Sequence, residues 1–333
     1  MVWQNLRLRP GAAYRVLTFG LWIVSVWVGL AGLSGTASGA PEAMPRPAAA
    51  ASVPAENADR FSSLIRLQSG DAAGPVERQV IRVLGRSIDF CEQLWGVRLE
   101  QPIQLYICED DDQLAAVLSA VVQDPPETAR RMARFAAACV NDYRMFIKRS
   151  SLARMNAAQF SGIVCHETVH IFQRQQQLRG ADPAAAPAPW LKEGYAELVS
   201  RLFVANRQLA SFQTYRRDSY DIAAALARSS PGVLPRLADI GATQWLAVAE
   251  RIGAAYLYRC TAVAAAYLLR LSGDDHRRFA AYFAGHRPDG AAPFTAAFGL
   301  TTAEFQDRWE RYLSSNHAGR TLSGDHQDPV WLY

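Results

Sequence analysis

The stretch 157–179, AAQFSGIVCHETVHIFQRQQQLR, combines the apolar spacing of a long helix with two histidines four residues apart. Residues i and i+4 lie on one face of a helix, so the imidazoles of His166 and His170 are close enough to bind one metal ion. Glu167 lies beside that position, where its carboxylate can accept a proton from water without binding the metal. The alternative is a pair of helix-surface histidines next to a glutamate.

A catalytic zinc site needs a third protein ligand and an open fourth position. The next predicted helix contains WLKEGYAE at 190–197, and 22 residues separate its Glu193 from His170. A carboxylate in this place completes a two-imidazole zinc site and lowers its net charge. The other interpretation of Glu193 is a solvated acid in the first turn of a helix, where the helix dipole favours it.

This order of motifs, HETVH at 166–170 followed by WLKEGYAE, resembles the gluzincin metallopeptidases, whose third zinc ligand is the glutamate of a WLxEGxAE segment. The resemblance implies Zn²⁺ held by His166, His170 and Glu193, with Glu167 as the general base. It also implies that Glu197, one turn after Glu193, holds the imidazole of His166. An exposed helical acid is the alternative for Glu197. The resemblance covers about residues 103–313.

The same resemblance implies a tyrosine that stabilises the oxyanion formed during peptide hydrolysis. In the gluzincin helix this tyrosine precedes a second aromatic residue by nine positions, and here Tyr267 indicates Tyr258 rather than Tyr256. Packing of a tyrosine in an apolar helix is an equally good explanation of Tyr258.

These features predict a zinc metallopeptidase outside the cytoplasm that hydrolyses a peptide or protein substrate. Two alternatives remain open: a zinc hydrolase acting on cell-wall peptide, and an envelope binding module with a zincin fold and no turnover. The net charge is +4, but residues 1–40 contain three arginines and no acid, so the remainder carries +1. A near-neutral body excludes a protein built to coat nucleic acid.

Residues 1–40 have the features of an export signal. An apolar run at 16–33 follows Arg7, Arg9 and Arg15 and precedes a segment of small residues. Because the run also reaches the lower limit for spanning a bilayer, both a cleaved signal peptide and an N-terminal membrane anchor are expected alternatives. Either one places the rest of the chain outside the cytoplasm, in the periplasm or the medium. An anchor would also tether it to the membrane.

The pattern predicts an α+β, zincin-like fold with a small N-terminal mixed sheet followed by a mainly helical part. An alanine- and proline-rich linker is expected at 41–58, one catalytic domain at 59–315 and a tail at 316–333. The predicted elements are a helix at 76–94, a strand at 97–108, a helix at 111–122, a hairpin of 136–140 and 143–148 around Asn141-Asp142, and helices at 157–179, 189–207, 211–228, 252–272, 275–285 and 302–314. Capping boxes are predicted at Asn156 with Gln159 and at Thr301 with Glu304. One of the hairpin strands is expected to be a sheet edge that pairs with an extended peptide.

The five cysteines and the remaining histidines give further expectations. Cys108 and Cys139 lie on predicted strands and are candidates for a disulfide, whereas Cys165 is predicted to be a buried thiol. Four histidines lie among charged or turn residues and are predicted to be exposed: His276, His286, His317 and His326.

Overall fold

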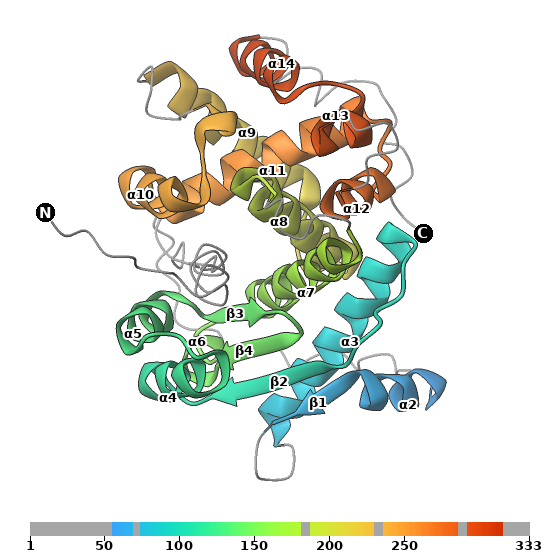
Figure 1. Cartoon of the computed structure of the whole chain (residues 1–333), viewed down its shortest axis with the longest axis vertical. Coiled ribbons are helices and arrows are strands. Elements are labelled where there is room, and N and C mark those ends of the chain that lie inside the picture. The colour runs from blue at the N-terminus through green and yellow to red at the C-terminus, as the bar shows by residue number, and fades with distance from the viewer. Residues whose placement is uncertain (1–54, 69–73, 181–186, 230–235, 286–291, 316–333) are drawn as a thin grey trace, which may run out of the picture.

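The computed structural model describes residues 55–68, 74–180, 187–229, 236–285 and 292–315 of the chain (Figure 1). The elements are α2 (Ala55–Leu64), β1 (Ile65–Leu67), α3 (Pro75–Trp95), β2 (Ile103–Cys108), α4 (Asp111–Val117), the π-helix η2 (Leu118–Val122), α5 (Pro126–Phe135), β3 (Ala138–Asn141), β4 (Arg144–Lys148), α6 (Arg149–Leu152), α7 (Ala157–Arg179), α8 (Pro189–Asn206), α9 (Phe212–Ser229), the 3₁₀-helix η3 (Leu237–Asp239), α10 (Ala242–Ile252), α11 (Ala254–Leu271), α12 (Arg277–Phe283), α13 (Pro293–Phe298) and α14 (Thr302–Ser314).

The four strands form a mixed sheet in the order β1-β2-β4-β3. The pairs β1–β2 and β2–β4 are parallel, and β3 runs antiparallel to β4. The hairpin is present as predicted, although Asn141 pairs with Arg144, so the turn consists of Asp142 and Tyr143 rather than Asn141-Asp142. Asp142 has φ +53°, a left-handed conformation that aspartate tolerates in tight turns. In this sheet β3 is an edge strand and β4 is an inner strand.

Alternate side chains of the strands pack on opposite faces of the sheet. One face, with Leu105 and Ile147, belongs to the main core that also contains α3 and α7. The other face, with Phe146, packs against Leu114 of α4 and Met132 of α5. The sheet is therefore covered by helices on both sides.

The expected Cys108–Cys139 disulfide is wrong. Cys108 pairs with Lys148 across β2 and β4, and Cys139 pairs with Phe146 across β3 and β4. Because β4 lies between them, the two cysteines are two strand spacings apart, about 10 Å, beyond the reach of a disulfide. All five cysteines are buried thiols, including Cys165 as predicted.

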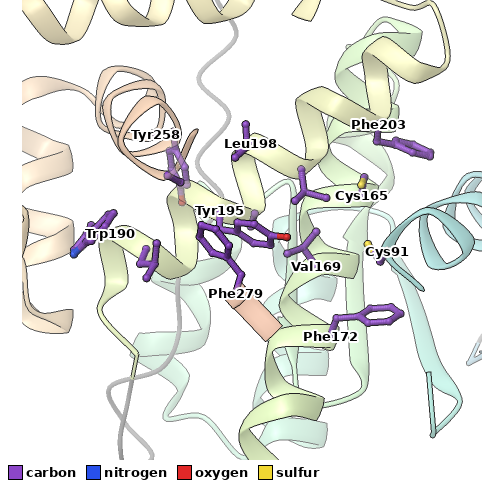
Figure 2. Close-up of a cluster of buried hydrophobic side chains, with 14 of the residues drawn as sticks. Cys91, Cys165, Val169, Phe172, Trp190, Tyr195, Leu198, Phe203, Tyr258 and Phe279 are labelled. Carbon is purple, nitrogen blue, oxygen red and sulfur yellow. The ribbon is translucent and has the colours of Figure 1, made fainter. Parts of the chain in front are cut away.

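Helix α7 lies between the sheet and the C-terminal helices (Figure 1). It packs on α3 and β3 on one side and on α8 on the other, and α8 in turn packs on α11. Gly194 permits the close approach of α8 to α11, because a Cβ at this position would lie 2.3 Å from the carbonyl oxygen of Thr261. Figure 2 shows the apolar side chains that fill these interfaces, among them Val169, Tyr195 and Leu198.

The prediction of an α+β fold is confirmed, with a small mixed sheet and a mainly helical C-terminal part. Both predicted capping boxes are present, at Asn156 and at Thr301. The sequence did not predict β1, α5, α6, α10 and α13, and the strand predicted at 97–108 begins only at Ile103. Helix α2 starts at Ala55, inside the expected linker.

The predicted export segment lies outside the described residues, as do most of the linker and most of the tail. Within the described ranges, every helix is too short or too polar to cross a membrane.

Candidate metal centre

Two helices bring the predicted metal ligands and Glu167 together. The buried part of α7 carries His166, Glu167 and His170, and α8 carries Glu193 opposite them. The histidines are 1% and 5% exposed and Glu193 is fully buried. The capping box at Asn156 and the apolar residues around the motif fix α7 as a helix, so the two imidazoles share one face.

The distances among these three side chains fit a tetrahedral metal. Nε2 of His170 lies 3.1 Å from Nε2 of His166 and 3.1 Å from Oε1 of Glu193. Nε2 of His166 lies 3.4 Å from Oε2 of Glu193. Ligands at about 2.0–2.1 Å from a tetrahedral centre lie about 3.3 Å from one another. Among the described residues these three are the group of histidine, cysteine and acid side chains close enough to hold one metal ion.

A glutamine that the sequence analysis missed fixes the tautomer of His170. Gln173 is fully buried, and its Nε2 donates to the carbonyl oxygen of Lys192 at 2.9 Å. Since a carbonyl only accepts, Oε1 of Gln173 must face His170, where it accepts from Nδ1 at 2.7 Å. In the neutral ring the proton is therefore on Nδ1, and the lone pair on Nε2 is left for a metal at the centre. Gln173 also ties His170 to the residue before Glu193.

Glu197 lies where the resemblance implies, next to His166. Its Oε2 is 3.5 Å from Nδ1 of His166, a long distance for a hydrogen bond but short for charge attraction. Its Oε1 accepts from Nε of Arg201 at 2.8 Å and from the hydroxyl of Tyr215, on α9, at 2.9 Å. Glu197 is buried rather than an exposed helical acid. Arg201 is four residues after Glu197 on the same helix, so its spacing could have identified it as a partner of Glu197. No sequence signal indicates Tyr215 as the second partner.

The charges of the site shift the pKa values of its members. Burial opposes a charge on His166, but Glu193 and Glu197 outweigh that effect and raise its pKa to about 10. Burial also opposes the ionisation of Glu193, yet His170 and His166 hold its pKa well below the usual value. For Glu197, Arg201 and then His166 overcome the effect of burial and lower the pKa to about 2. Both carboxylates are therefore ionised at neutral pH.

Tyr258 of α11 faces the metal centre, whereas Tyr256 does not. The ring of Tyr258 lies 5.8 Å from that of His166 in an edge-on arrangement, and Trp245 of α10 packs on its other side at 5.7 Å. Tyr256 is 38% exposed. Burial and the nearby carboxylates of Glu193 and Glu167 raise the pKa of Tyr258 well above its usual value, so its hydroxyl remains protonated.

Glu167 is fully buried on α7, the helix that packs on the edge strand β3. Burial first, and then the charge of Glu167, raise the pKa of the Cys139 thiol in β3. The carboxylate of Glu167 is also close enough to act on Tyr258 and His166. It therefore lies among the metal centre, the tyrosine and the edge strand.

The prediction that His276 is exposed is wrong. His276 is 5% exposed, and its Nδ1 lies 2.8 Å from the hydroxyl of Tyr195, which belongs to the WLKEGYAE segment. Burial lowers the pKa of His276 to about 4, so the ring is neutral. Because α12 packs against α7, its first residues are covered by the core. The other three histidines predicted to be exposed, His286, His317 and His326, lie outside the described residues.

Comparison of the chain with protein-family models, curated proteins and solved structures gave no match.

Gln173→Ala should weaken zinc binding by roughly 10- to 100-fold, because His170 loses the acceptor that fixes its tautomer and orientation. The measurement is a competition titration against a chromophoric zinc chelator. Gln177→Ala, one turn further along α7, is the matched control, since its Nε2 has no hydrogen-bond partner among the described residues. Equal zinc affinity in all three proteins would remove Gln173 from the site.

Proposed function

We propose that this chain is a zinc-dependent peptidase of the gluzincin type with a zincin-like fold. The observation that carries the proposal is a buried cluster of three side chains, in which the Nε2 atoms of His166 and His170 and the carboxylate oxygens of Glu193 make contacts of 3.1–3.4 Å. Glu167 and Tyr258, which the proposal needs for chemistry, lie around the same point. We further propose that the enzyme acts outside the cytoplasm, on the basis of the expected export segment at 1–40.

In this proposal His166, His170 and Glu193 hold the zinc, and Gln173 and Glu197 orient the two imidazoles. Zinc supplies a Lewis acid that polarises the scissile carbonyl and lowers the pKa of water. Glu167 takes a proton from the attacking water and then donates it to the leaving amine. Tyr258 donates a hydrogen bond from its protonated hydroxyl to the oxyanion.

The edge strand β3 is the proposed binding position for an extended peptide. The backbone N–H of Lys148 donates to the carbonyl oxygen of Ala137 at 2.9 Å. Counting along the ladder from this pair, Cys139 and Asn141 form the next hydrogen-bonded pairs with β4. Because pairs alternate along an antiparallel ladder, the N–H and C=O groups of Ala138 and Val140 face away from β4. A substrate strand would add to this edge by β-augmentation, near the carboxylate of Glu167.

Glu167→Gln should lower kcat/KM for peptide cleavage by roughly 10²- to 10⁴-fold while zinc content stays near one ion per chain. The amide has nearly the same shape as the carboxylate but cannot accept the proton. The assay is a peptide-library digest with a chelator control, coupled to metal analysis.

Full activity of Glu167→Gln would contradict the mechanism. Zinc binding by the wild type without cleavage of any library peptide would contradict the peptidase. Cleavage restricted to cell-wall peptides would instead support the alternative substrate.

Tyr258→Phe should lower kcat by roughly a hundredfold with little change in KM, because the hydroxyl acts on the oxyanion and not on the bound substrate. Tyr256→Phe, two residues earlier on the same helix and exposed, is the matched control and should keep the wild-type kcat. Equal rates for the two variants would assign Tyr258 a packing role only.

Val140→Pro should raise KM for extended peptides by roughly tenfold, the effect of losing one hydrogen bond of about 1.4 kcal/mol. Proline is tolerated here because the lost N–H faces away from β4. Val140→Ala keeps the N–H and controls for the smaller side chain. An unchanged KM in a folded Val140→Pro variant would exclude β3 as the peptide-binding edge.

A further inference from the structure

Three arginines lie on α3 and at the C-terminal end of α8, where these two helices adjoin. Arg82 and Arg86 are four residues apart on α3, and therefore share one face of that helix. Arg207 follows the last residue of α8. The rings of Phe90 and Phe203 are in tilted contact, with centroids 5.5 Å apart, which shows that these parts of α3 and α8 adjoin. The guanidinium of Arg207 extends over the Phe203 ring, 5.7 Å from its centroid.

No acid offsets these charges among the described residues. The carboxylates of α3 are all engaged elsewhere, since Asp89 and Glu92 pair with Arg60 at 2.7 and 2.5 Å, and Glu77 pairs with Arg149. Within the described part of the chain, no carboxylate lies within 4.0 Å of Arg82, Arg86 or Arg207. The cluster therefore has three positive charges and no counter-charge of its own.

The excess of positive charge is clearest at Arg207. Its Nη1 is buried and has no hydrogen-bond partner among the described residues. Burial first, and then the charges of Arg86 and Arg82, lower the pKa of Arg207. The C-terminal dipole of α8 favours one cation at this position, but does not explain why two more lie beside it.

We propose that Arg82, Arg86 and Arg207 form a binding site for a phosphate group. A guanidinium group pairs with an oxyanion through two parallel N–H donors. Three guanidinium groups therefore supply more N–H donors than the two oxygens of a carboxylate can accept. A tetrahedral phosphate presents three or more oxygens to such a cluster. The phosphate belongs to a soluble phosphate ester or to the headgroup of an anionic lipid, and the site is separate from the proposed zinc site.

Thermal unfolding of the full chain in sodium phosphate and in sodium chloride of equal ionic strength tests the site. Phosphate should raise the unfolding midpoint of the wild type more than chloride does. R82Q/R86Q and R207Q should bind phosphate roughly tenfold more weakly or worse. R130Q/R134Q is the matched control, because it removes two exposed arginines with the same spacing from α5 and should behave as the wild type.

In chloride, R82Q/R86Q should be at least as stable as the wild type, because the substitutions remove repulsion, so weaker phosphate binding will not reflect misfolding. Its zinc content should also be unchanged, which separates this result from the proposed peptidase function.

Flotation with vesicles of phosphatidylcholine, with and without phosphatidylglycerol, distinguishes the sources of the phosphate. Weaker binding of R82Q/R86Q than of the wild type to the anionic vesicles indicates a lipid headgroup. Equal flotation, together with the difference in phosphate binding, indicates a soluble ester. The proposal is overturned if phosphate stabilises the wild type and R82Q/R86Q alike, or stabilises neither more than chloride does.

Discussion

Glu193 is fully buried and ionised, and a carboxylate in that position costs several kcal/mol unless its surroundings compensate for the lost water. The compensation comes from two imidazoles on α7, so α7 and α8 must pack with His166 and His170 facing Glu193. Gly194 lets α11 pack against the other side of α8 at backbone distance. The buried charge of Glu193 and the missing side chain of Gly194 therefore constrain the packing of α7 on α8 and of α8 on α11.

The groups around the centre are held by a second set of buried contacts. Gln173 connects His170 to the main chain of α8, and Glu197 connects His166 to Arg201 and Tyr215. Each contact restricts an imidazole to one orientation before any metal binds. Ligands fixed in this way lose less conformational freedom on binding, which is why such partners affect metal affinity although they do not touch the metal.

The sequence predicted those features that depend on local spacing. The helical period placed His166 and His170 on one face, and the resemblance indicated Glu193, Glu197 and Tyr258, all of which lie at the centre. Features that depend on tertiary packing were missed or wrong. Strand order alone decides that β3 rather than β4 is the edge and that Cys108 cannot reach Cys139. Likewise, the burial of His276 follows from the packing of α12, which its charged neighbours in the sequence do not indicate.

An ion pair that contributes little stability links the turn of the hairpin to α7. Nε of Arg174 donates to Asp142, in the turn of the hairpin, at 2.7 Å. Both side chains are partly exposed, so the pair itself is worth at most about 1 kcal/mol. Arg174 is, however, one turn after His170 and two turns after His166 on α7, so the contact joins the hairpin to the helix that carries two of the proposed metal ligands. The pair adds to the packing of β3 on α7, which brings the outward-facing backbone groups of Ala138 and Val140 near Glu167.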